Sequence, residues 1–106
     1  MNLTNNAELV LTEIYKRYLE KEDLDLPNAN YFEANFLSNC EVFGRPKPNT
    51  VYSALIELNK NKFITLYLSR SFSLNTDGIA YMEEKYHKNL NKVKDFIKEA
   101  IFRRIA

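Results

Sequence analysis

Polar and cationic side chains suited to binding a polyanion gather between residues 45 and 53. Arg45 and Lys47 precede a segment that starts at Pro48, and four hydrogen-bonding side chains follow it: Asn49, Thr50, Tyr52 and Ser53. Arg and Lys pair with phosphates, whereas Asn and Ser bond to base edges or to phosphates. The pattern therefore indicates contact with a nucleic acid. The alternative is that Asn49 and Thr50 only cap a helix, while Tyr52 packs on a neighbouring element.

The charges are unevenly spread along the chain, although their sum is only +1. Residues 1–26 carry three cations and six carboxylates, a net charge of −3. Residues 41–75 carry five cations and two carboxylates, a net charge of +3. This asymmetry favours a polyanion as the partner of the middle of the chain, and it adds Lys62 and Arg70 to the predicted contacts. The alternative is a solvated surface with chance clustering.

Other kinds of chemistry lack the residues they need. With one histidine, His87, and one cysteine, Cys40, the chain has too few soft ligands for a zinc site. The acidic run at residues 20–25 lacks the glycine and the spaced oxygen ligands of a calcium loop. There is no nucleophile elbow, no glycine-rich phosphate loop and no Ser/His/Asp set. We therefore expect no enzymatic activity, no metal and no cofactor.

Length and composition predict one globular domain. The chain has 106 residues, of which 45% are hydrophobic, so it can bury a core. It contains no run of the roughly 18–20 apolar residues that cross a membrane. Its first six residues do not resemble a secretory signal, and its single cysteine cannot form an internal disulfide. We expect a cytoplasmic protein.

The elements that must position these side chains can be predicted from apolar spacing, and they give a mostly α, α+β fold. Residues 6–22 read as a first helix capped by Asn5 or Asn6, and residues 30–38 as a short second helix. A third helix follows Pro48, capped by Asn49 or Thr50, and ends near residues 59–61. Its buried face comprises Val51, Ala54, Leu55 and Leu58.

A β-hairpin is predicted after this helix. Residues 63–68 are β-branched and aromatic, and residues 71–74 alternate polar and apolar side chains. Ser69 and Arg70 form the connection between the two strands. Arg70 at the tip is placed to enter a minor groove or to contact a phosphate, although an idle surface position explains it equally well.

One unbroken helix is predicted from about residue 76 to residue 104. Its apolar seam recurs at spacings of three and four residues: Ile79, Met82, Tyr86, Leu90, Val93, Ile97 and Ile101. Such a helix is roughly 40 Å long, and a core built from the preceding residues could not cover it. We therefore predict a homodimer in which a second chain covers Tyr86, Leu90, Val93, Ile97 and Ile101. The alternative is a helix folded back over its own domain.

The order of helix, helix, helix, hairpin and long helix resembles the winged helix-turn-helix layout. Residues 48–58, PNTVYSALIEL, are similar to the recognition helix of PadR-like repressors, with its Pro-x-Thr-aliphatic-Tyr-x-x-Leu-x-x-Leu pattern. Residues 74–78, LNTDG, resemble the family's Leu-Thr-x-x-Gly segment that leaves the wing. The resemblance covers residues 45–85 and extends to the first 40 residues only by helix order. The chain departs from the family in its wing, which is not glycine-rich and basic, and Lys62 stands where those proteins usually have glycine.

The resemblance implies a winged-helix core at residues 6–75 and a dimerisation helix at residues 76–104 within a single domain, 1–106. It also implies a dimeric repressor that binds a palindromic site on double-stranded DNA. Two alternatives stay open: a winged-helix module that binds proteins, and a plasmid or phage protein for partition or replication. A small-molecule effector also stays open, because aromatic side chains could line a pocket, although a plain core explains them better.

Overall fold

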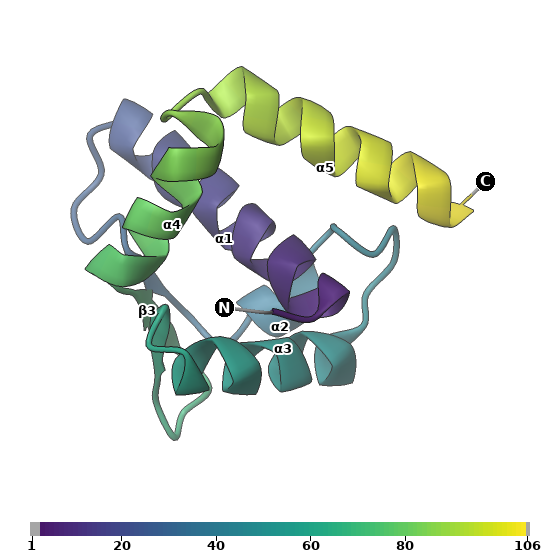
Figure 1. The fold of residues 1–106 in the computed structure, drawn as a ribbon. Helices are drawn as coiled ribbons and strands as arrows, with labels where there is room; N and C mark the ends of the chain where they lie inside the picture. The colour runs from purple at the N-terminus through teal and green to yellow at the C-terminus, as the bar shows by residue number, and fades with distance from the viewer. Residues whose placement is uncertain (1–2, 106) are drawn as a thin grey trace.

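The computed structural model describes residues 3–105 and consists of helices around a small antiparallel sheet. The first helix, α1 (Asn5–Asp23), lies between α3 (Pro48–Lys60) on one side and α4 (Thr76–Tyr86) and α5 (Leu90–Ile105) on the other (Figure 1). The remaining elements are α2 (Phe36–Asn39) and the strands β1 (Tyr31–Phe32), β2 (Ile64–Leu66) and β3 (Phe72–Leu74). The prediction of a mostly helical α+β domain is confirmed. Within the described residues, no helix has the length and apolar character needed to cross a membrane.

The first and third predicted helices are confirmed, but their caps are not. Thr4 caps α1, because its hydroxyl oxygen accepts a hydrogen bond from the Ala7 backbone N–H at 3.2 Å. Helix α3 starts two or three residues earlier than a cap at Asn49 or Thr50 would allow, with Lys47 as the cap and Pro48 as the first helical residue. Proline suits that position because the N–H it lacks would have no partner within the helix. The buried face of α3 is the predicted one: Val51, Ala54, Leu55 and Leu58.

The predicted second helix at residues 30–38 is wrong over its first half. Tyr31 and Phe32 instead form an edge strand that pairs with Ser73 and Phe72 of β3, and only a single helical turn follows. The Phe32 ring stacks on the Phe72 ring with their centroids 5.2 Å apart. This contact joins segments that lie far apart in the sequence, so tertiary packing overrides the local helical spacing.

The predicted hairpin is present, with a longer loop than the Ser69–Arg70 connection. Strands β2 and β3 pair from Ile64 opposite Leu74 to Leu66 opposite Phe72, which leaves residues 67–71 in the loop. The Tyr67 N–H donates to the Ser71 carbonyl oxygen, and the Arg70 N–H donates to that of Tyr67, both at 2.9 Å. Arg70 takes the left-handed conformation, with φ of 70°.

The predicted single C-terminal helix is wrong: the chain breaks after Tyr86 and α5 turns back onto α1 (Figure 1). His87 and Lys88 both adopt left-handed backbone angles, and Asn89 caps α5 by accepting a hydrogen bond from the Lys92 N–H at 3.2 Å. This packing buries Val93 and Ile97 in the domain's own core. Within one chain, the arrangement is therefore close to the alternative prediction, in which the C-terminal segment folds back over its own domain.

Gly78 lies where the first turn of α4 meets the start of the hairpin. A Cβ atom at this position would lie 2.5 Å from the Phe63 carbonyl oxygen and 2.9 Å from Cδ1 of Leu74. The Asn75 N–H donates to the same Phe63 oxygen at 2.9 Å. The close approach of α4 to the backbone before β2 therefore requires glycine here.

We predict that Gly78→Ala destabilises the fold by about 1–3 kcal/mol, because the added methyl group overpacks this contact. Urea unfolding followed by circular dichroism measures the change. Ala80→Ser, at an exposed position of the same helix, is the control and should cost no more than about 0.7 kcal/mol. If Gly78→Ala raised the stability, as alanine does in an open helix, the contact would not be tight.

Candidate nucleic-acid interface

The N-terminal half of α3 presents most of the predicted contact residues. Its apolar face packs on α1, so Asn49 and Ser53 on the opposite face are exposed. Thr50 and Tyr52 are partly buried at the edges of this face. The free N-terminal N–H groups of a helix attract anions, so this end of α3 is electrostatically suited to phosphate.

The loop before α3 places Arg45 and Lys47 at the same end of the helix. Gly44 takes a φ of 79° in this loop, and its N–H donates to the Glu41 carbonyl oxygen at 2.9 Å. Arg45 is exposed, while the Lys47 ammonium nitrogen lies 6.0 Å from the centroid of the Phe43 ring. Both cations therefore flank the start of α3, as the sequence predicts.

The hairpin tip reaches α3 through one contact that sequence reasoning missed. The Arg70 guanidinium carbon lies 4.4 Å from the centroid of the Tyr52 ring, which is a cation–π geometry. Arg70 is therefore held beside the exposed face of α3, and the structure brings these two predicted residues together. A cation and an aromatic ring could have suggested that Arg70 and Tyr52 interact. Whether they meet, however, depends on the length of the hairpin loop at residues 67–71.

Lys62 is the predicted contact that does not join the group. It follows α3 with a φ of 63°, beyond the end of the helix opposite to Asn49. The helical rise from Asn49 to Lys60 alone is about 16 Å at 1.5 Å per residue. Its backbone oxygen accepts a hydrogen bond from the Asn75 side chain at 3.1 Å. Its surroundings include Tyr18, Asn28 and Asp77, which line the same surface hollow.

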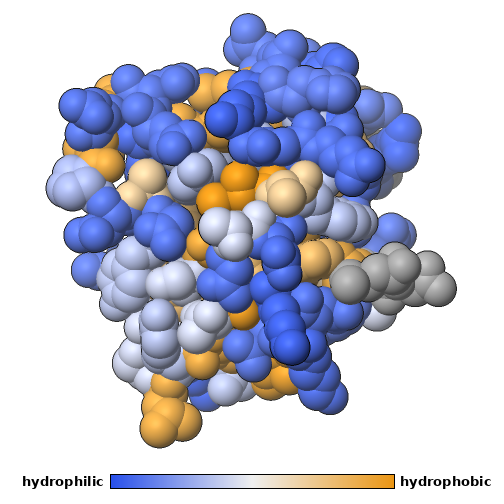
Figure 2. All heavy atoms as spheres, turned by 60° about the vertical axis from the view of Figure 1, so that its left-hand side comes forward, coloured by the Kyte–Doolittle hydropathy of each residue, from blue (hydrophilic) through white to orange (hydrophobic). Residues whose placement is uncertain are grey.

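Hydrophobic side chains also lie on this surface, and the sequence pattern predicted no role for them. Ile56 follows Tyr52 by one helical turn and is 40% exposed. Tyr67 and Leu68 lie in the hairpin loop, and Leu68 is fully exposed. Figure 2 shows hydrophobic atoms at the lowest point of the molecule, where the hairpin tip lies in Figure 1. The surface thus combines cations, hydrogen-bonding groups and exposed apolar groups.

Ion pairs are distributed unevenly over the described residues. All of them join groups outside residues 42–75, such as Arg17 with Glu13 at 2.8 Å and Lys85 with Glu8 at 2.6 Å. Glu57, the one carboxylate within residues 42–75, accepts hydrogen bonds from the N–H and hydroxyl groups of Thr4 at 2.8 and 2.7 Å. Within residues 3–105, the five cations of that region therefore have no carboxylate partner.

The residues predicted for dimerisation do not form an exposed face. Tyr86, Val93 and Ile97 are buried in the core, and Leu90 and Ile101 are partly buried against it. Phe96 and Phe102 are the exposed large apolar side chains of α5 within the described residues. The expectation that the domain leaves these apolar residues uncovered is therefore wrong. The association of two chains stays a prediction.

Comparisons with models of protein families, with curated proteins and with solved structures found no match to this chain.

We predict that Tyr52 and Arg70 are energetically coupled by about 0.5–1 kcal/mol, the size of an exposed cation–π contact. A double-mutant cycle of Tyr52→Leu and Arg70→Gln on the free energy of unfolding measures this coupling. Glutamine is preferred to glycine at position 70 because it keeps a side chain at the left-handed backbone position. Additive effects within about 0.3 kcal/mol would contradict the contact, and Arg70→Lys should retain part of the coupling.

Proposed function

We propose that this protein is cytoplasmic, binds double-stranded DNA in a sequence-specific manner and acts as a transcriptional repressor. In this proposal α2 and α3 serve as a helix-turn-helix, the β2–β3 hairpin is the wing, and α3 enters the major groove. Two copies bind a palindromic operator and repress by occupying it. The same residues would serve a plasmid or phage protein in partition or replication.

The observation that carries the proposal is the set of unpaired cations around α3. Within the described residues, Arg45, Lys47, Lys60, Lys62 and Arg70 form no ion pair, whereas most cations elsewhere, such as Arg17, Lys85 and Arg103, lie next to a carboxylate. Neutralising phosphates releases condensed counterions, and this release supplies much of the affinity of proteins for DNA. A net charge of +1 for the whole chain is therefore compatible with DNA binding, because the relevant charge is local.

The geometry supports a division of roles. Arg45 and Lys47 at the start of α3 are placed for phosphates, and Asn49 and Ser53 on its exposed face are placed for base edges. Arg70, supported by the Tyr52 ring, would contact the backbone or the minor groove beside them.

A protein-binding module is the second candidate function, and the exposed apolar side chains of this surface favour it. Ile56 and Leu68 place hydrophobic area among the polar groups, as the cores of protein interfaces do. A protein partner would bind through this area and would tolerate the loss of Arg45 and Lys47.

We predict that the purified protein enriches a palindromic sequence from a random pool of duplex DNA at low and at near-physiological salt. The variant Arg45→Ala/Lys47→Ala should weaken binding to all sequences alike. It should also lower the slope of log affinity against log salt by about 2, one unit for each lost phosphate contact. Asn49→Ala should instead change which sequences are enriched, because it alters a base contact.

Lys92→Ala/Lys98→Ala is the matched control. It removes two exposed cations of α5 that form no ion pair with any described residue. The net charge therefore falls by the same amount, but at a site away from α3. If both double variants lowered the affinity equally, binding would be non-specific attraction by net charge. No binding even at low salt would exclude the DNA-binding function and direct attention to the protein-binding module.

A further inference from the structure

The connection between α4 and α5 is strained. His87 and Lys88 have φ angles of 52° and 59°, two consecutive non-glycine residues in the left-handed region. In that region the Cβ atom of an L-residue crowds the following carbonyl oxygen, which is why glycine normally occupies it. The strain persists only because the packing of α5 on α1 holds it in place.

The sequence across this connection suits one continuous helix. The seam that begins at Ile79 continues through Tyr86, Leu90 and Val93 to Ile101 without a change of spacing. Residues 79–105 contain no proline and no glycine. Asn89, which caps α5, is the only helix-start signal in the connection. The local sequence and the strained break therefore conflict.

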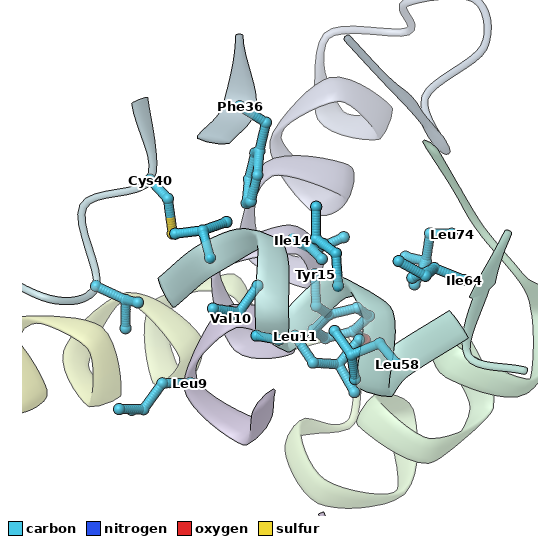
Figure 3. Packing of buried hydrophobic residues seen from close by; sticks show 14 of the residues in the cluster. Leu9, Val10, Leu11, Ile14, Tyr15, Phe36, Cys40, Leu58, Ile64 and Leu74 are labelled. Carbon is cyan, nitrogen blue, oxygen red and sulfur yellow. The ribbon is translucent and has the colours of Figure 1, made fainter. Parts of the chain in front are cut away.

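Helix α5 covers an apolar surface of the domain. Val93 is fully buried and Ile97 is 4% exposed. Leu9 lies on the side of α1 that faces α5, where it lines one hollow with Phe96 and Ala100 (Figure 3). Without α5 this surface would be exposed to water, so any form in which α5 leaves requires an equivalent α5 in its place.

A buried hydroxyl group lies beneath the same connection. Tyr15 is fully buried, and its hydroxyl oxygen lacks a hydrogen-bond partner of good geometry. Burial raises the pKa of Tyr15, and the nearby backbone of Lys88 lowers this pKa by a smaller amount.

We infer that α5 is exchanged between two copies of this chain: α4 and α5 straighten into one helix, and each α5 packs on the α1 of its partner. A helix over residues 76–105 is about 45 Å long and carries α5 away from its own domain. The contacts of Val93 and Ile97 are then the same contacts, made between chains. The exchange keeps the packing of α5 on α1 and releases the strain at His87 and Lys88, the situation in which short strained hinges favour domain swapping.

The exchange also brings partner residues to the candidate DNA-binding surface. In the closed chain, Ile101 lines a hollow together with Cys40, Gly44 and Arg45, in the loop before α3. In the exchanged dimer this Ile101 comes from the partner, so each copy would support the loop of the other. The inference specifies how the homodimer of the proposed function is built, but it does not depend on DNA binding.

Opposite substitutions at the hinge test the inference without DNA, by sedimentation over a wide range of protein concentration. His87→Gly/Lys88→Gly relieves the left-handed strain and weakens a continuous helix, so it should shift the equilibrium toward the monomer. His87→Ala/Lys88→Ala keeps the strain and strengthens a continuous helix, so it should shift the equilibrium toward the dimer. One left-handed residue changes an equilibrium constant roughly tenfold, and each dimer releases four of them, two in each chain. We therefore expect the two dimerisation constants to differ by about ten-thousandfold.

Asn89→Ala and Asn91→Ala provide the matched control. Both raise helix propensity equally, but only Asn89 caps α5, so Asn89→Ala alone should favour the dimer. The inference is overturned if the glycine and alanine variants have the same oligomeric state, or if Asn91→Ala shifts it as much as Asn89→Ala. A dimer that is insensitive to all four variants would retain the homodimer of the proposed function with a different interface. Loss of DNA binding with a normal response of the hinge variants would leave the exchange intact.

Discussion

The burial of α1 on almost its whole circumference is the constraint on which the rest of the structure depends. Seven consecutive residues, 9–15, are buried, and they include the polar residues Thr12 and Glu13. Two of these side chains require fixed partners: Thr12 donates to the Glu8 carbonyl oxygen at 2.8 Å, and Glu13 accepts from Arg17. Since a buried carboxylate is costly unless it is paired, Arg17 is held in place.

Arg17 in turn fixes the segment that leads to α3. Its Nη2 atom donates to the Asn39 carbonyl oxygen at 2.6 Å, at the end of α2, and its guanidinium lies 5.3 Å from the centroid of the Phe36 ring. From that end the chain passes through the loop that carries Arg45 and Lys47. The position of these surface cations therefore depends on a carboxylate buried in the centre of the domain.

Apolar periodicity predicted the elements whose neighbours are local, and it failed where distant segments decide. Helices α1 and α3 and the hairpin follow from their own spacing and turn residues. The edge strand at Tyr31 and Phe32 exists because β3 offers it a partner, which the sequence near residue 31 does not indicate. The break at His87 occurs where the helical pattern is uninterrupted, so only the packing of α5 on α1 explains it. Among the candidate contacts, the face of α3 was predictable from its buried stripe, whereas the contact between Arg70 and Tyr52 depends on the hairpin loop.

The close approach at Gly78 has a mechanical consequence. The first turn of α4 and the chain entering β2 touch through backbone atoms, with Asn75 bonded to the backbone oxygens of both Lys62 and Phe63. The contacts with Phe63 involve its backbone rather than its side chain, so the first turn of α4 and the start of the hairpin move together. Because the Phe63 N–H also donates to the Leu58 carbonyl oxygen of α3 at 3.0 Å, one backbone segment ties the ends of α3, the hairpin and α4 together. A substitution that loosened this junction would therefore disturb all three elements at once.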